Sequence, residues 1–193
     1  MISFLVFHGN IVKSQRVFLN KIPSHSTILW IGGGSGKVLP QLLDIKKQHH
    51  IDYIEASEKM LLRAKKTGSS LTTSRGVQFI HGDHTKIPDK EYDVIVTFFF
   101  LDLFKKNKSA HIFDLIDSKL KSNGLWLYAD FTPSKHRKHR LLEKIMFYFL
   151  KAFTHIENNK IEDHVPLFKE FFTLKMKSVY YDGYIVSSVY QKN

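Results

Sequence analysis

Glycines crowd into one short stretch of the chain, directly after a run of apolar residues. The stretch contains Gly32, Gly33, Gly34 and Gly36. The run before it, residues 27–31, reads Thr-Ile-Leu-Trp-Ile, and a segment with helical spacing begins at Val38. A strand, a glycine-rich turn and a helix in this order bring backbone close to a ligand, because no side chain blocks the approach. The stretch therefore predicts a binding site formed by backbone.

The spacing of these glycines separates three kinds of site that use this device. A phosphate-binding P-loop needs a glycine five residues before a Gly-Lys pair and Ser or Thr after it. The residues around Gly36 and Lys37 meet neither requirement, because Ile31 precedes the pair at that distance and Val38 follows it. The dinucleotide fingerprint needs a later glycine where Lys37 stands. What remains is glycine at alternate positions, from residue 32 to residue 36.

An acidic residue ends the second apolar, β-prone segment of the chain. Glu55 stands 23 residues after Gly32, at the end of residues 51–56. A carboxylate at the end of a neighbouring strand can accept both hydroxyls of a ribose in a bidentate hydrogen bond. The alternative is that Glu55 is a solvated acid at a strand end. Its place beside the glycine turn favours a ribose-binding role.

The elements that position these residues alternate along the chain. Apolar, β-prone segments predict strands over residues 27–31, 51–56, 77–81, 92–99 and 125–130. Apolar spacing predicts helices over residues 38–47, over a segment with Met60, Leu61 and Ala64 on one face, and over residues 109–120, where a glycine cap at 122–124 ends the helix. Alternating strands and helices imply βαβ units and a parallel sheet.

The end of the chain departs from this alternation. Residues 172–181 and 184–190 are two extended segments, joined by Asp182 and Gly183, which favour a tight hairpin. The fold class predicted is therefore α/β: a Rossmann-like three-layer sandwich with a mostly parallel seven-stranded sheet that ends in an antiparallel hairpin.

The turn and the order of elements resemble class I S-adenosylmethionine-dependent methyltransferases. In that family the first strand ends in Asp-x-Gly-x-Gly-x-Gly, and the methionine part of the cofactor lies against the turn. The resemblance covers residues 27–104 and implies S-adenosyl-L-methionine as the cofactor. One position departs from the pattern, because Trp30 stands where the family has the acid that helps to position the loop and the cofactor's amino group.

The resemblance also implies which residues hold the cofactor. Residues 54–60 are similar to the family's second-strand turn, with Met60 beside the adenosine, and Asp83 matches the acid that binds the adenine amino group. His84 is either a neighbour of the adenine ring or solvated, and Asp83 is alternatively a loop cap. The cofactor-binding residues implied are Gly32, Gly33, Gly34, Gly36, Glu55, Ala56, Met60, Asp83, His84, Thr97 and Phe98.

Catalytic residues are less readable than the cofactor site. Methyl transfer from a sulfonium needs mainly the alignment of acceptor and methyl group in a dry pocket, and a base is needed only if the acceptor loses a proton. Asp102 either faces the acceptor or caps the following helix, and His136 is the other candidate. His136 and His139 lie three residues apart on a basic helix, where solvated side chains are the alternative. No metal site is predicted.

We expect a single methyltransferase domain over residues 1–193. Within it, residues 1–22 form a lid helix, residues 27–130 the cofactor-binding core, and residues 131–193 the acceptor side with its helix at 141–153. The lid helix rests on apolar positions seven residues apart, at Phe4, Leu5, Ile11, Val12, Phe18 and Leu19. The acceptor half is loosely similar to menaquinone and ubiquinone C-methyltransferases. That similarity suggests a small hydrophobic or quinone-like acceptor, with any acidic group near Arg137 and Arg140.

Composition narrows the partners. The chain has no Cys, which excludes disulfides and thiolate metal sites and fits a reducing cytoplasm. No segment approaches the roughly 18 apolar residues of a membrane span. The net charge of +11 favours an acidic partner, nucleic acid included. The basic cluster at residues 136–140 lacks the interleaved aromatics of RNA-binding surfaces, so RNA is not favoured. The alternative function is a non-catalytic cofactor- or RNA-binding protein on the same fold; an oxidoreductase is disfavoured by the glycine spacing.

Overall fold

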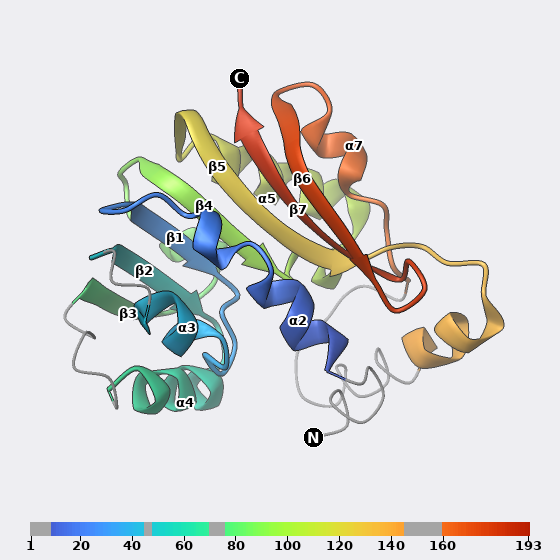
Figure 1. Cartoon of the computed structure of the whole chain (residues 1–193), viewed down its shortest axis with the longest axis horizontal. Helices are drawn as coiled ribbons and strands as arrows, with labels where there is room; N and C mark the ends of the chain where they lie inside the picture. The colour runs from blue at the N-terminus through green and yellow to red at the C-terminus, as the bar shows by residue number, and fades with distance from the viewer. Residues whose placement is uncertain (1–8, 45–47, 70–75, 145–159) are drawn as a thin grey trace.

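A seven-stranded sheet forms the centre of the molecule in the computed structural model, which describes residues 9–44, 48–69, 76–144 and 160–193 (Figure 1). The strands are β1 (Thr27–Ile31), β2 (His50–Glu55), β3 (Val77–His81), β4 (Tyr92–Phe98), β5 (Leu120–Phe131), β6 (Phe172–Tyr180) and β7 (Ile185–Lys192). Their order across the sheet is β3-β2-β1-β4-β5-β7-β6. The first five strands in this order pair in parallel, and β7 and β6 pair antiparallel. The predicted fold class is confirmed.

The register aligns the carboxyl ends of the parallel strands. Ile31 at the end of β1 pairs with Ile54 in β2 and with Thr97 in β4, and Thr97 pairs with Tyr128 in β5. The residues that follow these four positions therefore lie in one row along a single edge of the sheet. Glu55 and the first turn glycine, Gly32, stand side by side in that row, which is where open α/β sheets bind their ligands.

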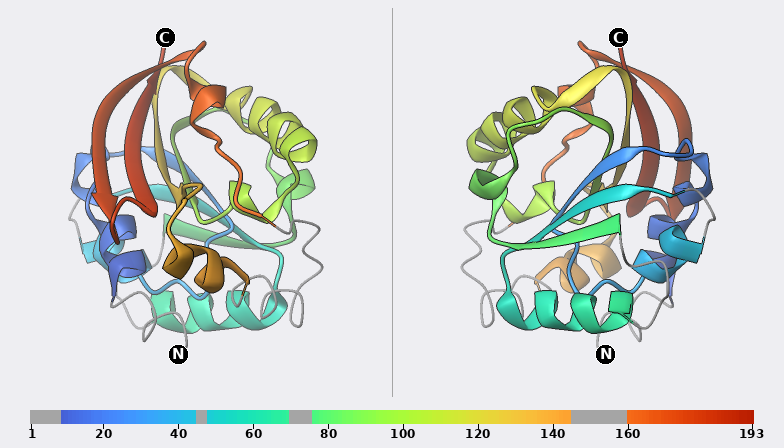
Figure 2. Two further views of the ribbon diagram at one scale, coloured as in Figure 1. Left: turned by 90° about the vertical axis from the view of Figure 1, so that its right-hand side faces the viewer. Right: turned by 90° about the vertical axis from the view of Figure 1, so that its left-hand side faces the viewer.

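Helices cover both faces of this sheet and complete three layers (Figures 1 and 2). The helices are α2 (Asn10–Arg16), α3 (Leu39–Asp44), α4 (Glu58–Ser69), α5 (Lys106–Asp117) and α7 (Val165–Phe168), with shorter 3-10 turns η1 (Leu19–Lys21), η3 (His84–Lys86) and η4 (Leu101–Leu103). Residues 137–144 are also helical. Side chains of α3 and α4 share one core with the sheet, and side chains of α5 and α7 share the other.

Alternate residues of each central strand divide between these two cores. Ile28 and Trp30 of β1 pack in the core beneath α3 and α4, whereas Leu29 and Ile31 pack in the core beneath α5 and α7. Because successive side chains of a strand point to opposite faces, a strand covered on both faces has to be apolar throughout. The almost unbroken apolar sequences of β1 and β4 follow from this burial.

The segment between α5 and β5 differs from the prediction. The helix spans Lys106–Asp117 rather than 109–120, and the predicted glycine cap at 122–124 lies inside β5. Tyr92 pairs with Leu120 but Val94 pairs with Leu125, so the additional residues of β5 form an irregularity opposite Asp93. Asn123, with φ of 62°, makes the bend. The predicted glycine cap is therefore wrong: residues 122–124 form a bulge of the strand rather than a helix end.

The amino-terminal region also differs from the single lid helix predicted over 1–22. The helix described there, α2, has seven residues, and Leu19 lies buried in the separate turn η1. Ile11 packs against a small cluster that contains Phe131 and Tyr184, whereas Val12 packs against the core beneath α3 and α4. The apolar residues of this region therefore pack against two different parts of the molecule and do not form one helix face. Phe4 and Leu5 lie outside the described residues.

Other element boundaries shift by a few residues. In α4, Leu61 and Ala64 are buried as predicted, but Met60 is exposed and does not share their face. The helix predicted over 38–47 is described as α3 up to Asp44, and residues 45–47 lie outside the described part, as do residues 145–153 of the helix predicted over 141–153.

The predicted terminal hairpin is confirmed. Strands β6 and β7 pair along their length, and the connection carries positive φ at Tyr181, Asp182 and Gly183 (51°, 53° and 81°). Such angles favour Gly and Asp, which the sequence supplies at two of these positions. The hairpin places its turn beside the carboxyl end of β5, because Ile185 pairs with Phe131.

An aromatic cluster fixes α7 to the sheet and gives a test of the fold. The ring of Phe168 stacks on Tyr190 at 4.0 Å between centroids and meets Phe113 and Trp126 edge-on. We expect Phe168→Ala to lower the free energy of unfolding by about 3–5 kcal/mol, because it removes a fully buried ring. Urea denaturation measures this. Phe171→Ala is the matched control, since Phe171 is 49% exposed; a loss as large as that of Phe168→Ala contradicts the assignment of the cluster.

Candidate functional site

The glycine turn after β1 adopts a backbone conformation that depends on glycine. Gly32, Gly34 and Gly36 have φ of 66°, 64° and 72°, in the left-handed region. A Cβ on Gly32 would stand 2.6 Å from a ring carbon of Phe100, so that side of the turn is closed by packing. At Gly34 nothing lies within 4 Å of the position of a Cβ. The turn is therefore packed on one side and open at Gly34.

Strand β2 holds this turn through its last two residues. The backbone N–H groups of Gly32 and Gly33 donate to the carbonyl of Ile54, at 3.0 and 3.3 Å. The N–H of Gly34 donates to Glu55 Oε2 at 2.7 Å, and Glu55 Oε1 accepts from the N–H of Ser57 at 2.8 Å. Each carboxylate oxygen offers two lone pairs. Glu55 therefore anchors the turn and keeps acceptor capacity for a ribose.

The turn after β3 is tied to the same strand end. The N–H of Gly82 donates to the carbonyl of Glu55 at 3.1 Å, and His81 Nε2 lies 3.0 Å from the carbonyl of Ala56. Asp83 follows directly. Its Oδ1 accepts from the backbone N–H and the hydroxyl of Thr85, at 2.9 and 2.7 Å, and these bonds lower the Asp83 pKa. Asp83 thus caps η3, directly after the glycine that is hydrogen-bonded to Glu55.

His84 is half-buried, with its ring against an aromatic side chain. Its ring meets Phe104 edge-on at 5.9 Å, and Phe104 in turn meets Phe100, the residue that closes the turn at Gly32, at 5.2 Å. Burial is the main cause that lowers the His84 pKa, so the imidazole is neutral at pH 7. A row of aromatic side chains therefore connects the third-strand turn to the glycine turn.

Thr97 and Phe98, predicted to line the cofactor site, direct their side chains into the cores. The Thr97 hydroxyl accepts a hydrogen bond from Trp126 Nε1 at 2.8 Å, on the face covered by α5. Phe98 lies in the opposite core and meets Trp30 edge-on at 5.6 Å. Because both side chains are buried, only the backbone of these two residues faces the edge of the sheet. The sequence alone could not tell whether Thr97 and Phe98 line the site or belong to the core, because apolar and small residues suit both places.

Trp30 makes no polar contact with the turn. Its ring is buried against Tyr53 and Phe98, and its Nε1 has no hydrogen-bond partner among the described residues. Tyr53, the neighbour of Trp30 in β2, instead donates from its hydroxyl to the carbonyls of Gly33 and Gly34. Sequence reasoning missed Tyr53. Its position two residues before Glu55, hence on the same side of the strand, is the signal that identifies it.

Two aspartates, one in η4 and one near the end of β5, meet in a buried pair. Asp102 is the weak catalytic candidate of the sequence, and its partner Asp130 was not predicted. Asp130 accepts from the backbone N–H groups of Asp102 and Phe131, at 3.3 and 3.1 Å. Burial raises the Asp102 pKa to about 6, and burial together with the neighbouring carboxylate raises the Asp130 pKa further. The pair therefore retains a proton at pH values where exposed aspartates are ionised.

The two histidines of the basic cluster meet edge-on, at 5.3 Å between ring centroids, but differ in burial. His136 is exposed, as expected of a solvated side chain, but His139 is only 3% exposed, which corrects that alternative for His139. His139 stacks on Tyr184 at 4.5 Å, and its Nδ1 lies 2.7 Å from the hydroxyl of Ser134. Burial lowers the His139 pKa. The structure thus places His139, rather than His136, against the aromatic residues of the hairpin turn.

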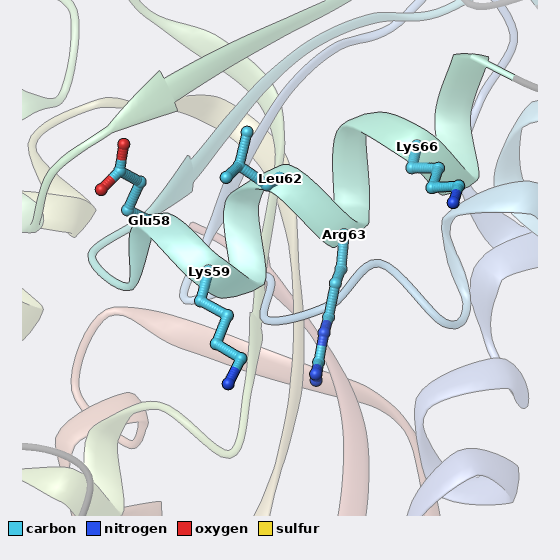
Figure 3. A pocket seen from close by; sticks show the side chains of 5 residues that line it. All are labelled: Glu58, Lys59, Leu62, Arg63 and Lys66. Carbon is cyan, nitrogen blue, oxygen red and sulfur yellow. The ribbon is translucent and has the colours of Figure 1, made fainter.

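A hollow of about 390 Å³ lies along the outward face of α4 (Figure 3). Its described lining consists of Glu58, Lys59, Leu62, Arg63 and Lys66. These side chains come from one helix, and none belongs to the glycine turn or to the strand ends. The hollow is therefore distinct from the candidate site at the edge of the sheet.

Within residues 9–44, 48–69, 76–144 and 160–193, no three His, Asp or Glu side chains gather closely enough to hold a metal ion. No helix in the same ranges is both long and apolar enough to cross a membrane.

The Asp102–Asp130 pair predicts a specific pH dependence of stability. Both pKa values are raised in the folded chain, so this contribution to stability is complete below about pH 4 and is lost as the pH rises through about 6 and beyond. We expect Asp102→Asn to reduce that loss by roughly 1 kcal/mol between pH 5 and pH 8, because an amide can donate to Asp130 without ionising. Denaturant unfolding at several pH values measures it.

Asp114→Asn is the matched control, because Asp114 is exposed on α5. The pH profile of Asp114→Asn should follow that of the wild-type protein. A profile of Asp102→Asn that also superimposes on the wild type contradicts the buried proton.

Comparison with known proteins agrees with this architecture. The sequence profile described as the methyltransferase domain matches residues 28–124, just over half of the chain. A malonyl-[acyl-carrier protein] O-methyltransferase of Halalkalibacterium halodurans is 38% identical over 114 residues, which cover 55% of this chain and 39% of that protein. The chain thus matches well under half the length of this relative.

Solved structures share the fold at low identity. The N-methyltransferase NodS of Bradyrhizobium japonicum WM9, in complex with S-adenosyl-L-homocysteine, superimposes with a TM-score of 0.69 at 12% identity, covering 97% of this chain and 87% of that one. Magnesium protoporphyrin IX methyltransferase of Synechocystis PCC 6803, with bound S-adenosylhomocysteine, gives 0.70 at 17% identity, covering 97% and 84%. These structures show the shared fold, and the profile match over half of the chain shows that it belongs to the class I S-adenosylmethionine-dependent methyltransferase family.

Proposed function

We propose that this chain is an enzyme that transfers the methyl group of S-adenosylmethionine to a small acceptor. S-adenosylmethionine is the cofactor of the family. The observation that carries the proposal is the contact between Gly34 and Glu55, because it joins an open glycine turn to a carboxylate at the end of the neighbouring strand. A nucleoside with a short polar tail fits this combination: the carboxylate suits ribose hydroxyls and the open turn suits the tail.

The residues around this contact suit the remaining parts of the cofactor. When bound, it supplies an electrophilic methyl group on a sulfonium. Glu55 and Ala56 hold the ribose side, and Met60, 37% exposed in the first turn of α4, offers a surface for the adenosine. Asp83 and the neutral His84, in the turn that Gly82 ties to Glu55, are assigned to the adenine. The backbone at Thr97 and Phe98 floors the site.

The acceptor side is proposed to lie beyond β5. Phe131 packs against Phe99 at 4.9 Å and against Tyr184 at 5.1 Å, so aromatic side chains of three segments gather there. Such a surface orients an apolar acceptor and excludes water, which is the main contribution that a methyltransferase needs from its protein. His139, neutral because burial lowers its pKa, stands in this cluster as the candidate base for an acceptor that loses a proton.

Two acceptor chemistries follow from what the chain resembles. The loose similarity of the carboxyl-terminal half to quinone methyltransferases supports a hydrophobic, quinone-like acceptor. The relative from Halalkalibacterium halodurans is named for a malonyl group on an acyl-carrier protein, which supports an acidic acyl acceptor. The aromatic cluster favours the quinone-like acceptor, and the cations at Arg137 and Arg140, both exposed, favour the acidic one.

Calorimetric titration with S-adenosylmethionine and S-adenosylhomocysteine tests the cofactor site. We expect micromolar binding, in the range of about −8 kcal/mol, to the wild-type chain. Glu55→Ala should weaken it roughly 10- to 100-fold, because hydrogen bonds to a charged group are lost. Glu58→Ala is the matched control: it removes the same charge from an exposed position three residues away. Absence of binding to the wild-type chain, or equal losses in the two variants, contradicts the proposal.

Transfer of a labelled methyl group to a panel of acceptors distinguishes the acceptor classes. Demethylquinones and malonyl thioesters on a carrier protein are offered to the same preparation. Label in the quinone alone supports the hydrophobic acceptor, and label in the thioester alone supports the acidic one. Binding of the cofactor without label in any member of a panel on which known enzymes act supports the non-catalytic alternative.

A further inference from the structure

The backbone N–H and the backbone carbonyl of Gly34 are each hydrogen-bonded to a side chain of β2. Glu55 accepts from its N–H at 2.7 Å, and the hydroxyl of Tyr53 donates to its carbonyl at 3.2 Å. The same hydroxyl donates to the carbonyl of Gly33. Two successive carbonyls of the turn thus converge on one phenolic oxygen.

The ring of Tyr53 is fixed in place by its neighbours. Tyr53 is fully buried between Trp30, at 5.6 Å between ring centroids, and Phe79, at 5.4 Å. A Cβ on Gly33 would overlap the end of the Tyr53 ring, so the turn rests directly on the tyrosine. Because the ring is buried, the position of its hydroxyl oxygen is fixed. The ring therefore sets the distance between the turn and the strand, and its hydroxyl supplies hydrogen bonds to the turn.

The hydroxyl remains a donor over the working pH range. Burial and the charge of Glu55 both raise the Tyr53 pKa above its ordinary value. A neutral O–H is also the group required here, because the carbonyls of Gly33 and Gly34 are acceptors. Trp30, next to Tyr53 in the register of β1 and β2, makes no polar contact with the turn among the described residues.

We propose that Tyr53 is the positioning residue of the cofactor site: through its hydroxyl it sets the conformation of the turn at residues 33–36 and so directs the Gly34 N–H onto Glu55. The inference rests on the proposed function for what the turn binds. Tyr53 itself touches no ligand; it acts through Gly34 and Glu55. Loss of the hydroxyl removes the donor from two partly buried carbonyls and loosens the backbone at Gly34, so the carboxylate no longer has a fixed orientation toward the ribose.

Tyr53→Phe and Tyr92→Phe form a matched pair of variants. Tyr92, the first residue of β4, is also a fully buried tyrosine, and its hydroxyl donates to Asp52 at 2.7 Å. It therefore lies at the amino end of its strand, away from the glycine turn. Both substitutions keep the ring and remove one buried hydroxyl. We expect Tyr53→Phe to weaken binding of S-adenosylhomocysteine roughly tenfold, as removal of a buried hydrogen-bond partner does. Tyr92→Phe should leave the affinity within about twofold of the wild-type value, whatever the change in melting temperature.

Amide hydrogen exchange of Gly34 in the ligand-free protein gives a readout that does not depend on the cofactor. Tyr53→Phe should accelerate exchange of the Gly34 N–H relative to the core amides of β4, whereas Tyr92→Phe should not. If the wild-type chain binds no S-adenosylhomocysteine, the proposed function fails while this exchange measurement still decides the role of Tyr53. Wild-type affinity in Tyr53→Phe, unchanged Gly34 exchange, or equal effects of both variants overturns the proposal.

Discussion

The hydrogen bond between the Gly34 N–H and Glu55 is the interaction on which the site depends. It links the glycine turn that follows β1 to the end of β2. For this bond to form, two neighbouring parallel strands must end at the same level, and the register of Ile31 with Ile54 provides that. The turn must also pass through left-handed backbone, which is why glycines stand at positions 32, 34 and 36.

The rest of the sheet keeps these strand ends in place. Both faces are covered, and the strands carry apolar residues on each side, so the polar groups of the parallel sheet lie mainly toward the strand ends. At the carboxyl ends, the pair of Asp102 and Asp130 retains a proton because burial raises both pKa values. The backbone N–H of Asp102 donates to the carboxyl group of Asp130, and this bond links η4 to the end of β5 on the side of the site opposite Glu55.

Much of this architecture is predictable from the sequence, because strong local signals agree with the global pattern. The glycine turn, Glu55 and the terminal hairpin each combine a turn signal with flanking apolar strands, and all three occur where expected. The predictions fail where one signal has two structural meanings. Asn123 and Gly124 suit a helix end and a bulge equally well, and only the pairing of β4 with β5 decides between them. Thr97 satisfies a core hydrogen bond that depends on Trp126, a residue 29 positions away. Tyr53 could not be identified in this way, because a tyrosine in a buried strand is as typical of the core as of a binding site.

A crystal structure of the chain with S-adenosylhomocysteine bound tests the central claim most directly. We expect the ribose hydroxyls on the carboxylate of Glu55, the homocysteine tail against the open side of Gly34, and the adenine between Met60 and Asp83. The hydroxyl of Tyr53 should remain on the carbonyls of Gly33 and Gly34. A nucleoside bound elsewhere, or a complex in which Glu55 contacts neither the ribose nor Gly34, would contradict the assignment of this edge of the sheet as the cofactor site.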